Sequence, residues 1–100
     1  MRATLKTDQA FVPGGAPGLD QVDLWRGRHD VSFQLLQAKK GAFPPHTHDA
    51  WEIMFVTAGK IKIDGTVFAP GDFLFTEPGE THQAEVLEDN TTVLIGFGKN

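Results

Sequence analysis

Turn-forming residues recur so often along this chain that they leave only short pieces between them. A Pro/Gly-rich segment occupies residues 13–18, and further turn signals fall at 26–30, 39–45, 64–65, 69–72, 77–80 and 88–90. The intervening pieces are four to nine residues long, which is the usual length of a β-strand. The spacing of the turns therefore predicts an all-β chain.

The composition of these pieces supports the same interpretation, because they are rich in β-branched and aromatic residues. The pieces are VSFQLLQA, WEIMFVTA, KIKID, TVFA, DFLFT, HQAEVLE and TTVLIGF. The segment 31–40 has a partly helical pattern, but its apolar residues alternate with polar ones and Gly41 follows it, so we expect a strand. Asp64-Gly65 lies between two alternating runs and predicts a tight antiparallel hairpin of type I′. Short antiparallel strands of this kind predict a sandwich or barrel.

The length of 100 residues allows one domain, and 40% hydrophobic with 22% charged residues is ordinary for a globular protein. We expect residues 1–18 to form an N-terminal arm with a Pro/Gly linker and residues 19–100 to form the barrel. The arm either lies along the body or pairs with a neighbouring subunit, and both alternatives remain open at this stage.

Charge and cysteine content narrow the range of functions. The net charge is −4 with a pI near 5.4, and no basic cluster is longer than Lys39-Lys40, so we expect no nucleic-acid partner. Cysteine is absent, which excludes disulfides and thiolate ligands and leaves nitrogen and oxygen to bind any metal. The first twenty residues contain no apolar signal-peptide core, and no run approaches about 18 apolar residues, so we expect a cytoplasmic protein that does not bind membranes.

The segment 51–58 places large side chains on both of its faces. Trp51, Ile53 and Phe55 alternate with Glu52, so they lie on the face opposite to it. Three large apolar side chains require cover from a second sheet, from a loop such as the N-terminal arm, or from another subunit. We favour another subunit, and therefore a homodimer.

A group of histidine and glutamate residues carries the chemistry of the sequence. His46, His48 and Glu52 share one parity along an extended chain, and His82 opens a second strand that antiparallel pairing brings opposite them. We call these four residues the His/Glu cluster. Three imidazoles and a carboxylate suit Fe(II), Mn, Ni, Cu or Zn and suit Ca or Mg poorly. An octahedral ion bound by these four residues would keep two open coordination positions, whereas a tetrahedral zinc would keep none. The fourth histidine, His29, lies in a polar turn, and we expect it to be a surface residue.

The spacing of these residues resembles that of a small single-domain cupin. The first motif of that family, a glycine, a His-x-His pair, a glutamate and a second glycine, is matched by Gly41, His46, His48, Glu52 and Gly59. Its second motif is matched by Gly71, Gly79 and His82. The departures are a spacing shorter by one residue after Gly41, a proline one place late at Pro78, and Val86 in place of a closing asparagine. The resemblance covers residues 31–97 and keeps all four ligand positions.

The resemblance implies a double-stranded β-helix, the cupin jelly-roll barrel, with one divalent transition metal ion in its mouth. Fe(II) is favoured, and Mn, Ni, Cu or Zn are possible. The metal ligands would be His46, His48, Glu52 and His82, with Glu52 also the catalytic proton acceptor. The expected function is that of a dioxygenase acting on a small diketone, hydroxyketone or phenolic compound.

Two alternatives to a dioxygenase remain, because one fold supports many reactions. One is a non-catalytic module that binds or senses a small molecule, and the other is a metal-dependent isomerase or lyase acting on a sugar-like substrate. The wall of an apolar pocket would come from candidates that can also be plain core, Phe33, Met54, Phe73 and Phe75. The polar groups for a sugar would come from residues that are more often at the surface, Gln34, Gln37, Glu80 and Gln83.

Overall fold

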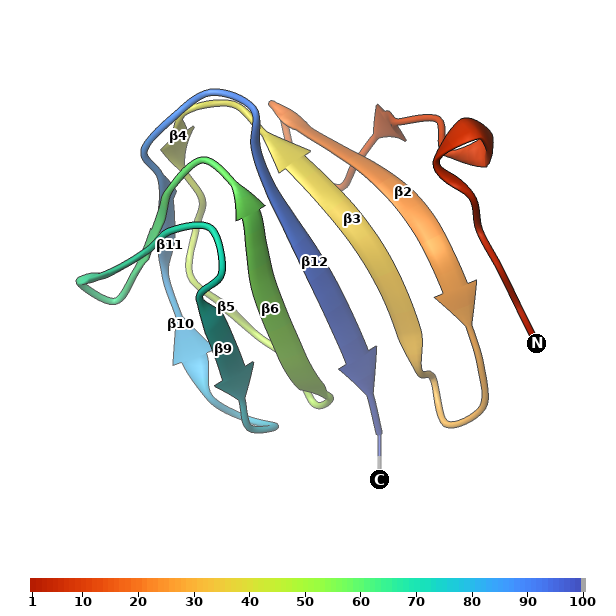
Figure 1. Ribbon diagram of the computed structural model, residues 1–100. Helices are drawn as coiled ribbons and strands as arrows, with labels where there is room; N and C mark the ends of the chain where they lie inside the picture. Colours follow the sequence, from red (N-terminus) through yellow and green to blue (C-terminus); the bar gives the residue numbers. More distant parts are fainter. Residues whose placement is uncertain (100) are drawn as a thin grey trace.

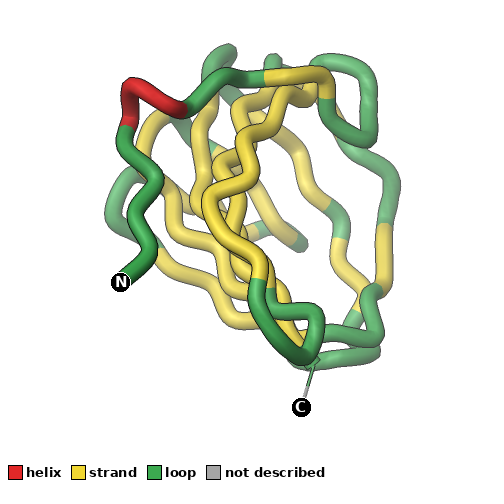
Figure 2. The backbone as a smooth tube through the Cα atoms, turned by 90° about the vertical axis from the view of Figure 1, so that its right-hand side faces the viewer, coloured by secondary structure: helices red, strands yellow, loops and turns green. Residues whose placement is uncertain are grey.

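The computed structural model describes residues 1–99 and consists of two layers of antiparallel strands (Figures 1 and 2). The first layer is a six-stranded sheet in the order β1-β2-β3-β12-β6-β9. The second layer contains a four-stranded sheet, β4-β11-β7-β8, and a two-stranded sheet, β10-β5. The bounds are β1 Val12–Pro13, β2 Leu19–Arg26, β3 Ser32–Ala38, β4 Gly41–Ala42, β5 His46–Thr47, β6 Trp51–Ala58, β7 Ile61–Ile63, β8 Thr66–Phe68, β9 Phe73–Thr76, β10 Thr81–His82, β11 Ala84–Val86 and β12 Thr91–Gly98. The predicted all-β jelly roll is confirmed.

The core lies between the two layers and is formed by alternate residues of the strands. Met54 and Val56 of β6 pair with Ile95 and Val93 of β12, and all four are buried. From the second layer, the buried residues that join the cluster are Ile61, Ile63, Ala84 and Val86. Because the side-chain period of a strand is two, the same alternation that buries Met54 also buries Glu52 on this inner face.

Local sequence signals account for most of these elements. Asp64 and Gly65 both have positive φ, 45° and 88°, and join β7 to β8 as the predicted hairpin. The only helix in residues 1–99 is a 3-10 turn, η1 Lys6–Asp8. The sequence does not predict β2, because an irregularity in its register between Asp23 and Trp25 breaks the alternation on which the pattern depends.

The N-terminal arm lies along the body of the same chain. Its strand β1 pairs with β2, with Val12 opposite Gln21 and Pro13 opposite Asp20. The Thr4 hydroxyl donates a hydrogen bond of 2.7 Å to the carbonyl oxygen of Leu24. In Figure 1 the arm is at the right-hand edge of the sheet, separated from β6 by β2, β3 and β12. Within the described residues, no helix is long and apolar enough to span a membrane.

The side of the six-stranded sheet that faces away from the second layer, here called the outer face, is apolar and open. Trp51, Ile53 and Phe55 lie on it as predicted, and Phe55 is 38% exposed. Phe73 and Phe75 of β9 stand opposite Phe55 and Ile53 with exposures of 56% and 46%. The arm, at the far edge of the sheet, does not cover these residues.

The outer face also corrects the interpretation of three phenylalanines. Phe73 and Phe75 are neither pocket nor core residues, because they share the parity of the outer face on β9. Phe33 pairs with Gly96 of β12, and a Cβ atom at Gly96 would lie 2.7 Å from the Phe33 ring. Phe33 therefore packs over a glycine on the outer face, and of the four aromatic or sulfur-containing candidates only Met54 faces the inside.

Candidate metal centre

Two short strands bring the histidines of separate sequence segments face to face. Strand β5 pairs with β10 in antiparallel register, so that His46 is directly opposite His82. The two Nε2 atoms are 3.0 Å apart, and the ring planes are nearly perpendicular at 85°. His82 is 8% exposed. The strand pairing predicted for the two motifs therefore places two imidazole nitrogens at one point.

Glu52 and His48 complete the cluster from β6 and from the segment before it. Glu52 is the second residue of β6 and is 6% exposed. Its Oε1 atom lies 3.5 Å from His48 Nε2, and its Oε2 atom lies 4.0 Å from His82 Nε2. Ligand atoms of His46, Glu52 and His82 all fall within 4.8 Å of one another. The structure thus brings the ligand atoms of His46, Glu52 and His82 together, while His48 lies outside this group, beside Glu52 and on the more exposed side.

A turn of the second motif holds the first motif in place. The backbone N–H of Gly79 donates a hydrogen bond of 2.8 Å to the carbonyl oxygen of His48. Gly79 has φ of 86°, which favours glycine at this position. The backbone N–H of Glu77 donates to a carboxylate oxygen of Glu80 at 2.9 Å, which closes the turn before β10. The loop that carries His82 is therefore fixed against the loop that carries His48.

Burial controls the charges of the cluster. It raises the pKa of the Glu52 carboxyl to about 7, since a buried carboxylate loses its hydration. Burial also lowers the pKa values of His48 and His82, and the positive charge of His46 lowers both further. The imidazoles of His48 and His82 are thus favoured in the neutral form, which carries the lone pair that binds a metal ion.

The donor set and its spacing fit a divalent transition metal. Adjacent ligand atoms bonded at about 2.0–2.1 Å to one octahedral or tetrahedral ion are separated by about 2.8–3.4 Å. The separations of 3.0 and 3.5 Å within the cluster are close to these values, and the separation of 4.0 Å exceeds them. Three imidazole nitrogens and one carboxylate are the donors that such ions prefer. A cation bound here would also compensate the buried charge of Glu52.

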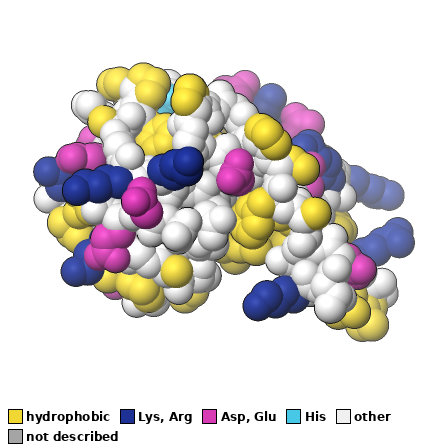
Figure 3. Space-filling view, turned by 90° about the horizontal axis from the view of Figure 1, so that it is seen from above, with side chains coloured by type: hydrophobic (Ala, Val, Ile, Leu, Met, Phe, Trp, Pro, Cys, Tyr) yellow, Lys and Arg dark blue, Asp and Glu magenta, His cyan; other side chains and the backbone are white. Residues whose placement is uncertain are grey.

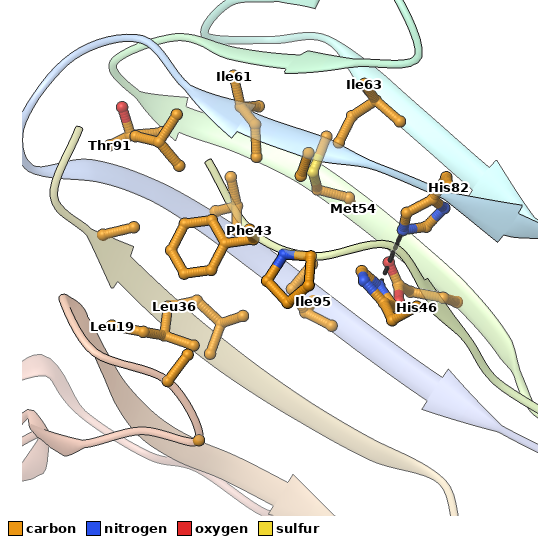
Figure 4. Close-up of a pocket in the computed structure, with 18 of the residues that line it drawn as sticks. Leu19, Leu36, Phe43, His46, Met54, Ile61, Ile63, His82, Thr91 and Ile95 are labelled. Carbon is orange, nitrogen blue, oxygen red and sulfur yellow. Dashed lines mark hydrogen bonds and ion pairs between the residues drawn. The ribbon is translucent and has the colours of Figure 1, made fainter. Parts of the chain in front are cut away.

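A cavity of about 420 Å³ extends from the cluster into the barrel between the two layers. Figure 4 shows His46 and His82 at one end and Thr91 with Leu19 at the other. Apart from the cluster and Thr91, every side chain that lines the cavity is apolar: Ala16, Leu19, Leu36, Ala38, Phe43, Pro44, Met54, Ile61, Ile63, Ala84, Val86, Val93, Ile95 and Phe97, with Gly15 also at the wall.

Sequence reasoning identified the cluster but missed most of this wall. Ile95 and Ile61 lie on predicted strands, but the sequence does not show which face of each strand meets the other layer and so lines the cavity. The one signal in the sequence is that Met54 shares the strand parity of Glu52, which places both on the cavity side. His29 is exposed in the turn between β2 and β3 with φ of 58°, as expected for a surface histidine.

Comparison with solved structures shows the same fold at low sequence identity. KdgF from a Halomonas species aligns with a TM-score of 0.83 and 20% identity over 100% of this chain and 94% of its own. Acetylacetone dioxygenase from Acinetobacter johnsonii aligns with a TM-score of 0.81 and 15% identity over 98% and 73% of the two chains. A chain from the complex of Rhodobacter sphaeroides SigE with the anti-sigma ChrR aligns with a TM-score of 0.77 and 21% identity over 95% of this chain and 52% of its own.

Sequence comparison assigns the family. No curated protein matches the chain in sequence. Residues 2–99 match the family model described as the ChrR cupin-like domain, which covers nearly all of the described residues. Together with two layers of antiparallel strands and cupin motifs that meet in space, this match shows that the chain belongs to the ChrR cupin-like domain family.

Proposed function

We propose that the protein is a metal-dependent enzyme that binds one divalent transition ion, with Fe(II) favoured, and acts as a dioxygenase. The substrate is a small diketone, hydroxyketone or phenolic compound. The proposal is carried by one observation: the His/Glu cluster converges at the end of a cavity that has room for a small molecule. The iron would supply the site at which the oxygens of the substrate and dioxygen bind.

The residues of the chain have separate parts in this proposal. His46, His48 and His82 hold the ion through their Nε2 atoms, and Glu52 is the fourth ligand. We also assign Glu52 the role of proton acceptor, because its carboxylate lines the cavity where the acidic hydrogen of a bound diketone or phenol would lie. The apolar wall keeps water away from the reacting atoms.

Metal content and oxygen uptake test this proposal in two steps. The protein is reconstituted anaerobically with Fe(II), desalted and analysed by mass spectrometry, beside His82→Ala and a matched control, His29→Ala. We expect one ion per chain in the parent and in the control, and loss of the ion in His82→Ala. Oxygen uptake with acetylacetone and with catechol should then depend on the bound iron; iron retention without uptake on any diketone, hydroxyketone or phenol would refute the dioxygenase.

A second candidate function is a non-catalytic sensor of a small molecule or metal. Two observations support it: the matching family is described as the ChrR cupin-like domain, and a structurally similar chain comes from a complex of SigE with the anti-sigma ChrR. In that case the metal-loaded protein binds small ligands in the cavity without consuming oxygen. Ligand binding with no turnover under aerobic conditions separates this candidate from the dioxygenase.

We further propose a homodimer formed through the outer face. The exposed Phe55, Phe73 and Phe75 belong to adjacent strands, and contiguous apolar patches of this kind mark protein interfaces. Figure 3 shows basic and acidic side chains interspersed on one face of the molecule. That the protein has no nucleic-acid partner stays a prediction from its net charge. We also propose that residues 1–18 form an arm and residues 19–100 form the barrel; residue 100 lies outside the described residues. A cytoplasmic location stays a prediction.

A further inference from the structure

We infer that the ligand of this site is an amphiphile, with a compact oxygen-donor head at the His/Glu cluster and an apolar tail that extends through the barrel. The inference of the head group depends on the metal site of the proposed function. The inference of the tail depends only on the cavity, and it adds an apolar chain to the oxygen chelator that the proposed function requires. The carrying observation is that the cavity is polar at one end only (Figure 4).

The wall between the two ends is made of side chains that cannot form hydrogen bonds. Ile61 and Ile63 of β7 face it from the second layer, and Leu36 of β3 and Ile95 of β12 face it from the first. Ile61, Ile63 and Ile95 are each at most 8% exposed, so the wall is held by core packing rather than by mobile surface groups. Such a wall favours carbon over hydroxyl or amide groups, since a buried polar group without a partner is costly.

The one polar side chain at the far end is already engaged by the backbone. The Thr91 hydroxyl donates to the carbonyl oxygen of Glu88 at 2.7 Å and accepts from the backbone N–H of Lys60 at 3.2 Å. Thr91 is 2% exposed. It therefore presents its methyl group as the remaining contact for a ligand, and the far end of the cavity is apolar in practice.

The polar side chains that a sugar-like substrate requires lie elsewhere. None of Gln34, Gln37, Glu80 and Gln83 lines the cavity. Gln37 donates from Nε2 to the Thr92 hydroxyl at 3.5 Å, and Glu80 accepts from the backbone of Glu77. A polyhydroxylated ligand would lose its hydration here without gaining partners, so the geometry argues against the isomerase or lyase acting on a sugar.

The volume sets the length of the tail. A cavity of about 420 Å³ corresponds to about fourteen water-sized groups at about 30 Å³ each, and close packing leaves room for a ligand of about ten heavy atoms. Leu19 and Thr91 mark the end of the cavity away from the cluster (Figure 4). A linear tail of five to seven carbons beyond the head group would reach this end, by the same approximate volume of about 30 Å³ per group.

Methyl NMR with a series of alkanoates tests the inference directly. Acetate, butyrate, hexanoate and octanoate are titrated anaerobically into protein loaded with Fe(II), which keeps open coordination positions, and into metal-free protein, with the metal content of each sample measured separately. We expect shifts in the methyl signals of Leu36, Ile61 and Ile95 inside the barrel, and none in Ile53 or Leu94 on the outer face. Affinity should rise about two- to fourfold for each added methylene up to hexanoate or octanoate.

The outcomes separate the tail from the metal site. If the protein retains the metal but the affinity for alkanoates is independent of chain length, or the shifts are confined to Ile53 and Leu94, the inference is overturned and the proposed metal site stands. If the protein does not retain the metal but the alkanoates still shift the inner methyl signals with an affinity that rises with chain length, the proposed function is removed and the apolar cavity is supported. Octanoate that shifts no inner methyl in either sample overturns the inference.

A variant that shortens the cavity provides a second test. Ala38 lines the far end, next to Leu19 and Thr91 in the sheet register, so Ala38→Leu fills that end with a larger side chain. We expect it to weaken octanoate binding at least tenfold and to leave acetate binding unchanged. Ala58→Leu is the matched control, since Ala58 is exposed. Equal weakening of acetate and octanoate by Ala38→Leu would contradict a tail that reaches this end.

Discussion

Replacing Glu52 by glutamine should stabilise the metal-free protein and weaken the metal-bound one. Glu52 is 6% exposed, and burial raises its pKa from 4.5 to about 7. A carboxyl whose pKa is raised by folding binds its proton more tightly in the folded state, and this adds to the free energy of unfolding below pH 4.5. The added stability is lost as the pH rises through 7. The difference corresponds to about 3 kcal/mol at about 1.36 kcal/mol per pH unit, as an upper bound.

The assay is urea unfolding from pH 4 to pH 8 in the presence of EDTA. Glu52→Gln should match the parent near pH 4 and exceed its free energy of unfolding by up to about 3 kcal/mol at pH 8. With Zn(II) added at pH 8 the order should reverse, because an amide is a weaker ligand than a carboxylate. Glu77→Gln, which changes an exposed carboxyl, is the control. Parallel pH profiles of the parent and Glu52→Gln in EDTA would refute the account of a buried charge that a cation must compensate.

Three further predictions concern other parts of the molecule. His82→Ala should lower metal affinity at least tenfold with little change in circular dichroism, while His29→Ala should not; equal metal occupancy in the two variants would contradict the ligand assignment. Phe55→Glu should give a monomer in sedimentation, and a parent that is already monomeric at micromolar concentration would end the proposal of a dimer through the outer face. Gly59→Ala should destabilise the fold by more than about 1 kcal/mol in urea unfolding, because Gly59 has φ of 80° and a Cβ there would collide with the side chain and backbone of Thr91. An unchanged midpoint would exclude this close approach.

The sequence predicted the cluster because its members follow rules that operate over a few residues. His46, His48 and Glu52 share a strand parity, and the turn at Gly79 precedes His82 at the start of a strand. The pairing of His46 with His82 then followed from the resemblance and from antiparallel register. Local alternation likewise predicted β6 with its apolar outer residues and the β7–β8 hairpin.

Features that depend on how the two layers meet were not predictable in the same way. Phe73 and Phe75 alternate correctly for a strand, but nothing local decides which parity faces the second layer, and the structure places them outside. The sequence does not predict β2, because the irregularity in its register changes the parity of its side chains partway along the strand. The apolar cavity likewise arises from residues of separate strands, such as Leu36 and Ile61, that meet only in the folded barrel.

We propose that the His/Glu cluster binds one transition metal ion through three imidazoles and one carboxylate. X-ray absorption spectroscopy of the protein loaded with one equivalent of Fe(II) tests it most directly. We expect nitrogen and oxygen ligands at about 2.0–2.2 Å, with multiple scattering from about three imidazole rings that falls to about two in His46→Ala. Iron without imidazole scattering, or an unchanged spectrum in His46→Ala, would contradict the claim.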